Sequence, residues 1–210
     1  VSYLLESTQR INRQEIAAAW DEIAPRYASR RDPSGSDAAL ITTLVQRLPA
    51  DPLILDVGCG DGARTLANLP AGSLGLDISR VALSLATAEV PDARLLRGDL
   101  GTVPIRDGAV DAITAYHAVF HVPRTEHPAV FDEFARLLRP TGWLLMTLPS
   151  RPVETVRRGW MGGRMRFSSL GRTATLDALA DAGFRVEETP TVTDPLGSTT
   201  EMVLATTDRQ

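Results

Sequence analysis

The sequence predicts an α/β fold, with a parallel sheet in a single αβα domain. The length of 210 residues suits one domain of this kind. Apolar runs of strand length alternate with amphipathic helical stretches, and the strand-like runs recur at intervals of roughly 20–30 residues. This alternation is typical of βαβ units, in which each helix connects two parallel strands.

The predicted elements follow in order along the chain. Five apolar runs are predicted strands, namely residues 53–57, 74–78, 93–97, 110–116 and 143–148. Three intervening segments have helical spacing, namely residues 63–69, 79–88 and 125–138, and Ser79 and Thr125 are expected N-caps. A helix over residues 173–182, closed by Gly183, precedes strands 184–188 and 201–206, which Pro195 and Gly197 in the intervening turn favour as an antiparallel pair.

Two regions lie outside this alternation. The N-terminal region is predicted to be helical over residues 12–30, with an interruption near Pro25, and over residues 37–48, with a flexible joint at 31–36. Residues 151–172 have no clear period and are expected to be irregular.

Composition excludes several classes of protein. The single cysteine, Cys59, excludes a disulfide framework and a zinc site built on thiolates, and we expect no metal. All 22 basic residues are arginine, which excludes Schiff-base and P-loop lysines. The net charge of −4 argues against nucleic-acid binding through overall electrostatics. Neither a membrane span nor a secretion signal is evident, so a soluble, cytoplasmic protein is expected.

A glycine-rich loop, Gly58-Cys59-Gly60-Asp61-Gly62, directly follows the first predicted strand. Glycines there allow a tight turn and a close approach of the backbone to a ligand. Asp77, at the end of the next strand, stands where such folds bind ribose hydroxyls. The loop alone fits either a dinucleotide or another nucleoside cofactor.

Three features favour a cationic nucleoside cofactor over NAD. Asp56 is expected to point at the loop, where it would repel a pyrophosphate and attract a sulfonium or amino group. Asp99, after the third strand, offers an acceptor for an adenine amine. The chain also has no room for the separate catalytic domain of an NAD-type oxidoreductase.

These motifs together resemble the class I S-adenosylmethionine-dependent methyltransferases, of the small-molecule branch known as methyltransferase type 11. The resemblance covers roughly residues 15–207 and rests on the segments 53–62, 75–79, 98–100, 110–113 and 137–142. Pro140-Thr141-Gly142 departs mildly from the family's Pro-Gly-Gly. The resemblance implies a seven-stranded sheet of order 3-2-1-4-5-7-6, with strand 7 antiparallel. It also implies S-adenosylmethionine as cofactor and S-adenosylhomocysteine as product.

The resemblance further divides the single domain into parts with distinct roles. Residues 1–50 would form an N-terminal helical lid, 51–150 the cofactor-binding core, 151–172 a substrate lid, and 173–210 a C-terminal helix and hairpin. The cofactor would contact the loop and the ends of the following strands, through Asp56, Gly58, Cys59, Gly60, Asp77, Ile78, Asp99, Leu100 and Tyr116.

Three residues are candidates for catalysis. His117 and His121 follow the fourth strand four positions apart, so a helix there would put both on one face, and either imidazole could accept a proton. Packing near the adenosine is the alternative role for each. Tyr27 lies in a stretch similar to the family's lid, where it would contact cofactor or substrate, or pack against Trp20.

The segment 151–172 carries six arginines and one acid, Glu154. Arg164 and Arg166 beside Trp160 would suit an acceptor with a carboxylate or phosphate on an apolar body, whereas the alternative is a solvated loop. Absence of the usual base-methylation motifs favours a small-molecule acceptor. Direct in-line methyl transfer is expected, because the sulfonium of the cofactor is already a good leaving group. A non-catalytic cofactor-binding module or partner subunit is the second hypothesis. The acceptor atom and the oligomeric state stay open.

Overall fold

The computed structural model describes residues 12–32, 35–194 and 196–208. One large sheet has the strand order β3-β2-β1-β4-β5-β10-β8, and β9 pairs with β10 at the margin. The strands are β1 Ile54–Val57, β2 Leu74–Asp77, β3 Arg94–Arg97, β4 Val110–Ala115, β5 Leu138–Leu148, β8 Phe184–Glu188, β9 Thr191–Thr193 and β10 Thr199–Thr207. β10 is antiparallel to both β5 and β8. The predicted order of seven strands, with the last one antiparallel, is confirmed.

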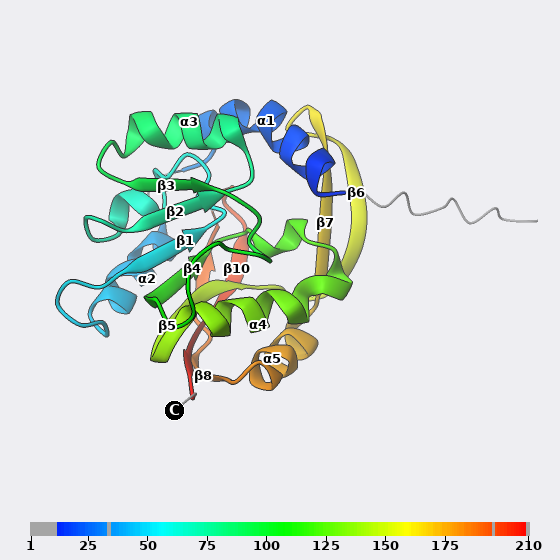
Figure 1. The fold of residues 1–210 in the computed structure, drawn as a ribbon. Coiled ribbons are helices and arrows are strands. Elements are labelled where there is room, and N and C mark those ends of the chain that lie inside the picture. Colours follow the sequence, from blue (N-terminus) through cyan, green and yellow to red (C-terminus); the bar gives the residue numbers. More distant parts are fainter. Residues whose placement is uncertain (1–11, 33–34, 195, 209–210) are drawn as a thin grey trace, which may run out of the picture.

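Helices cover both faces of this sheet, as Figure 1 shows. They are α1 Arg13–Arg30, α2 Ser36–Val45, α3 Arg80–Glu89, α4 His127–Leu137 and α5 Arg172–Asp181, with 3-10 helices η1 Leu66–Asn68, η2 Val119–His121 and η3 Arg124–Glu126.

Alternation along the central strands separates two cores. Leu55 and Ile113 face α4 and α5, where Phe131 and Phe134 are fully buried. Ile54, the neighbour of Leu55, faces α2 on the opposite side of the sheet. Successive strand residues point to opposite faces, so a strand buried on both sides reads as a continuous apolar run. The αβα layering follows from these two cores.

The predicted interruption at Pro25 is wrong, because α1 continues through it. Proline removes one backbone donor from the helix. Both Asn12 and Glu15 form a capping box at the start of α1, and Ile23 and Ala24 are buried next to the proline. Capping and burial stabilise the part of the helix that precedes Pro25.

The helix expected over residues 63–69 is also absent; the described segment contains only the 3-10 turn η1. Side chains at its start are engaged elsewhere, since Thr65 donates to Asp56 and Arg64 pairs with Asp37. These bonds hold residues 63–69 in a loop that is tied to β1 and α2.

Two local signals do not have the role that the sequence predicted: the helix cap expected at Thr125 and the turn expected at Gly197. Ser79 caps α3 as expected, accepting from the amide of Ala82 at 3.0 Å, but Thr125 lies in η3 and caps nothing. α4 begins at His127 with Pro128 in its first turn, a position that proline favours. The strands 184–188 and 201–206 do pair antiparallel, but Gly197 belongs to the β9–β10 connection; Pro195 lies outside the described residues.

Residues 151–172 are not irregular. They form a two-stranded antiparallel sheet of their own, β6 Pro152–Trp160 and β7 Gly163–Leu170. This β6–β7 hairpin curves beside the end of the large sheet near α1, and β7 contacts both α1 and η2 (Figure 1). Arginine-rich β6 is largely exposed, so the apolar alternation that marks a half-buried strand is missing from its sequence.

Candidate active site

The glycine loop turns sharply at the end of β1. The amides of Gly58 and Cys59 both donate to the carbonyl of Leu76, at 2.7 and 3.0 Å. Gly58 has φ +70°, and a Cβ there would lie 2.5 Å from the Cβ of Ala118. Gly60 has φ +59° with open space where its Cβ would be. The first glycine is required by packing, whereas the second leaves room on the pocket side.

Asp77 fixes this loop to the neighbouring strand. Its carboxylate accepts from the amide of Gly60 at 2.9 Å and from the amide of Ser79 at 2.8 Å. Burial raises the pKa of Asp77 although both amides oppose that shift. Asp77 lines the pocket beside Ile78, so the carboxylate is available to a ligand from that side.

Asp56 lies behind the loop and does not line the pocket. Its two oxygens accept from the hydroxyls of Thr65 and Thr114, the latter at 2.6 Å. Burial raises the pKa of Asp56 to about 7. These bonds join the end of β1 to β4 and to the segment after the glycine loop, whereas the sequence placed Asp56 in direct contact with the cofactor.

Asp99 and Leu100 line the far end of the same pocket. The carboxylate of Asp99 accepts from the amide of Gly101 at 2.8 Å and pairs with Arg13 of α1. A carboxylate has about four lone-pair sites, so further acceptor capacity stays available.

One cavity of about 530 Å³ connects the glycine loop to the β6–β7 hairpin. It is lined at the loop by Gly58, Cys59, Gly60, Asp77, Ile78, Asp99, Leu100 and Tyr116. The Tyr116 phenol donates to the carbonyl of Asp37 at 2.8 Å, and burial raises its pKa well above the usual value. Burial likewise raises the pKa of the Cys59 thiol. Neither group is a nucleophile at neutral pH.

Aromatic side chains line the opposite part of the cavity. The rings of Trp20, Tyr27, Trp160 and Phe167 pack edge-on or tilted, with centroids 5.1–6.0 Å apart along the cluster. We call these four residues the aromatic wall. Tyr27 does pack against Trp20, and it also lines the cavity; burial raises the pKa of its phenol to about 12.

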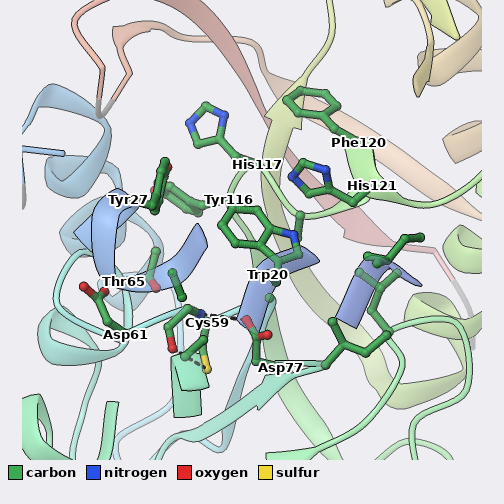
Figure 2. A pocket seen from close by; sticks show the side chains of 18 of the residues that line it. Trp20, Tyr27, Cys59, Asp61, Thr65, Asp77, Tyr116, His117, Phe120 and His121 are labelled. Carbon is green, nitrogen blue, oxygen red and sulfur yellow. Dashed lines mark hydrogen bonds between the residues drawn. The ribbon is translucent and has the colours of Figure 1, made fainter. Parts of the chain in front are cut away.

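Both candidate histidines line the cavity, although no α-helix joins them (Figure 2). His117 has φ +54° and precedes the 3-10 helix that contains His121. Nδ1 of His121 lies 2.8 Å from the carbonyl of Arg166. A carbonyl can only accept, so Nδ1 carries the proton and Nε2 keeps its lone pair.

The two imidazoles are neutral at neutral pH. Burial lowers the pKa of His121 to about 4 and also lowers that of His117. Nε2 of His117 is buried and has no hydrogen-bond partner among the described residues. It is available to a bound molecule.

The arginines of the hairpin do not lie where the sequence suggested. Neither Arg164 nor Arg166 lines the cavity, and the Arg166 guanidinium pairs with Glu154. Arg157 lines it instead, with its guanidinium carbon 4.9 Å from the centroid of Phe167. Selecting Arg157 required the register of the hairpin, in which residues 157 and 165 are paired.

Arg31 is a second residue that sequence reasoning missed. It ends α1, is buried, and pairs with Asp61 of the glycine loop. Its Nη1 is also buried and has no partner within the described part of the chain. A buried guanidinium nitrogen without a partner is costly unless an anion binds it.

The doubly covered parallel sheet, with its glycine loop and acidic strand end, defines a Rossmann-like nucleoside-binding domain. Residues 55–146 match the family model described as "Methyltransferase domain". The chain thus contains a methyltransferase domain and is homologous to the class I S-adenosylmethionine-dependent methyltransferases, as the sequence motifs predicted.

Curated relatives share a limited part of their length with this chain. A probable S-adenosylmethionine-dependent methyltransferase of Mycolicibacterium smegmatis is 27% identical over 138 residues, which are 65% of this chain and 53% of that protein. Trans-aconitate 2-methyltransferase of Rhizobium meliloti is 36% identical over 133 residues (60% and 49%). A tRNA (carboxymethyluridine(34)-5-O)-methyltransferase of Arabidopsis thaliana is 28% identical over 146 residues (69% and 35%). The chain spans about half or less of these relatives.

Solved structures agree on the fold. Magnesium protoporphyrin IX methyltransferase from Synechocystis, solved with bound S-adenosylmethionine, superposes with a TM-score of 0.70. The match covers 96% of this chain and all of that chain, at 16% identity.

The cavity fits this cofactor. Open space beside Gly60 admits the backbone approach of a ligand, and Asp77 and Asp99 offer acceptors for hydroxyl and amine donors. The unpartnered nitrogen of Arg31 suits the carboxylate of the cofactor's methionine part. Among the described residues, no group of three metal ligands occurs and no helix is long and apolar enough to cross a membrane.

Proposed function

We propose that this protein transfers a methyl group from S-adenosylmethionine to a small-molecule acceptor. The observation that carries the proposal is the continuous cavity, which joins the cofactor loop to the aromatic wall under α1 and the β6–β7 hairpin. Its volume of about 530 Å³ lies within the range of small-molecule sites. We also propose that the protein acts inside the cell, where the cofactor is made available to it.

The residues at the loop would hold the cofactor in a fixed orientation. Asp77 would accept from the ribose hydroxyls, Asp99 from the adenine amine, and Arg31 would bind the methionine carboxylate. Bound S-adenosylmethionine supplies a methyl group on a good leaving group, a sulfonium. In-line alignment of the acceptor with that methyl group then supplies much of the catalysis.

The histidines would manage the acceptor's proton. When the acceptor atom forms its bond to the methyl carbon, the sulfur–carbon bond breaks and its electron pair stays on sulfur. The proton on a hydroxyl or amine acceptor becomes strongly acidic at that moment, so the weak base Nε2 of His121 suffices to take it. His117 would hydrogen-bond the acceptor through Nε2.

A tRNA acceptor is the second candidate, because the Arabidopsis relative carries that name. The net charge of −4 is unfavourable for binding a polyanion through overall electrostatics. A third candidate is a module that binds the cofactor without turnover.

The test measures formation of S-adenosylhomocysteine by the purified protein. One reaction contains a protein-free small-molecule extract, and the other contains total tRNA. We expect product with the extract alone. Product with tRNA alone would support the RNA candidate, and calorimetric cofactor binding without product in either pool would support the binding module.

A second experiment addresses the proton acceptor. His121→Gln should lower kcat roughly 100-fold while the cofactor Kd holds. An equal loss in cofactor affinity would instead assign His121 a packing role between Trp20 and Phe167, its ring neighbours at 5.1 and 5.2 Å.

A further inference from the structure

Among the described residues, the acceptor half of the cavity combines an apolar surface with one cation, Arg157, with which no carboxylate pairs. The aromatic wall of Trp20, Tyr27, Trp160 and Phe167 supplies the apolar surface. The rings pack directly on one another, so they form a continuous wall and not a cage around an empty centre. An aromatic ring of a ligand can pack edge-to-face or offset-stacked against such rings.

Arg157 adds a positive charge at the edge of this wall. Its guanidinium stacks over Phe167, and within the part of the chain that the structure describes no carboxylate pairs with it. Other arginines of the same hairpin region do pair, Arg166 with Glu154 and Arg172 with Glu201. The stacked guanidinium keeps its planar donor edge available, the geometry that binds a carboxylate bidentately.

Asp194 also lines this half of the cavity. Its Oδ1 accepts from the amides of Leu196 and Ser198, at 2.9 and 2.8 Å, so part of its acceptor capacity is used within its own turn. Leu196, which lines the same cavity, is 45% exposed and extends the apolar surface. Charge and apolar area together favour an anion with an apolar body.

We propose that the acceptor is a flat, aromatic or conjugated carboxylic acid, whose ring lies on the aromatic wall and whose carboxylate binds Arg157. That the bound acid is also the methyl acceptor rests on the proposed function, whereas its binding at this site does not require turnover. The unpartnered Nε2 of His117 would then receive a hydrogen bond from a hydroxyl or amine elsewhere on the ring.

Direct binding tests the proposal without any reaction. The probes are 2-naphthoate, its neutral analogue 2-naphthamide, and the cation 2-naphthylmethylammonium, each titrated into the protein saturated with S-adenosylhomocysteine. We expect 2-naphthoate to bind about tenfold more tightly than 2-naphthamide, and the cation to bind most weakly. The affinity advantage of 2-naphthoate over 2-naphthamide should shrink as the NaCl concentration rises from 50 to 500 mM, because salt screens an exposed ion pair.

Matched arginine variants locate the charge. Arg157→Gln should remove the preference for 2-naphthoate, whereas Arg158→Gln should retain it, because adjacent strand residues point to opposite faces and Arg158 does not line the cavity. Trp160→Leu should weaken the binding of 2-naphthoate and of 2-naphthamide by the same factor.

Three results would overturn the proposal: equal binding of acid and amide to the unmodified protein, tightest binding of the cation, or equal losses in the two arginine variants. Failure of the proposed function looks different. In that case 2-naphthoate binding and its dependence on Arg157 persist, while no acceptor pool yields S-adenosylhomocysteine.

Discussion

The guanidinium of Arg13 lies 2.5 Å from the carboxylate of Asp99. This ion pair joins the first turn of α1 to the loop after β3, where the adenine is expected. Arg13 also pairs with Glu126 at 2.7 Å. The helix over the cavity is thereby attached to the cofactor side of the site at its N-terminal end.

Arg13→Gln should loosen this end of α1. Half-exposed ion pairs contribute about 0–1 kcal/mol, so we expect at most a roughly fivefold rise in the Kd for S-adenosylhomocysteine. Amide hydrogen exchange in the first turns of α1 should become faster. Arg80→Gln, an exposed change on α3, is the control, and unchanged exchange in α1 would refute the attachment.

Arg31 allows a sharper test of cofactor orientation. Arg31→Gln should raise the Kd for S-adenosylhomocysteine about tenfold, because a charged hydrogen bond to the carboxylate is lost. The Kd for 5′-methylthioadenosine, which lacks that carboxylate, should stay the same. Calorimetry with both ligands makes the comparison, and a parallel loss for both would mean that Arg31 acts only through Asp61 and the loop.

Two glycines separate backbone strain from ligand contact. Gly60 and Gly72 both have positive φ, +59° and +86°, and a Cβ at either would meet no protein atom within 4 Å. Each alanine variant should therefore lose about 1–2 kcal/mol of unfolding free energy from left-handed strain. Gly60→Ala alone should also weaken cofactor binding. Equal cofactor affinity in the two variants would place the ligand away from the loop.

The buried side chains of His121 and Asp56 predict opposite pH dependences of the free energy of unfolding. The pKa of His121 is about 4 in the fold and ordinarily 6.5, so below pH 6.5 the unfolded chain binds the proton first. Its contribution to stability is complete above pH 6.5 and is lost as the pH falls towards 4, on the order of 2–3 kcal/mol. Burial raises the pKa of Asp56 to about 7. Its contribution to stability is therefore largest below pH 4 and is lost as the pH rises through 7.

Chemical denaturation at pH 4.5 and 7 measures both effects. Relative to the unmodified protein, His121→Gln should gain stability at pH 4.5 compared with pH 7. Asp56→Asn should gain at pH 7 compared with pH 4.5. The same sign of change in both variants would contradict these pKa directions.

The parallel core was predictable because its signals are local. Strands buried on both faces are continuous apolar runs, and the turn at Gly58 demands a residue type that only glycine supplies. Ser79 likewise caps α3 through a bond three residues away. Each of these features depends on neighbours in the sequence.

The rest of the site depends on contacts between distant segments. Trp20 and Trp160 meet only because α1 and the hairpin converge. Arg157 was not distinguishable from Arg164 and Arg166 without the register of β6 against β7. Side-chain bonds from Thr65 and Arg64 to remote carboxylates replaced the helix expected after the loop.

The β6–β7 hairpin has its own two-stranded sheet and pairs with no strand of the large one among the described residues. Residues on it can therefore change without altering the register of the strands that carry Asp77 and Asp99. Exchange of this hairpin between related chains would be a way to evolve or engineer new acceptors on an unchanged cofactor-binding half. The same separation makes the hairpin a suitable place for directed mutagenesis libraries.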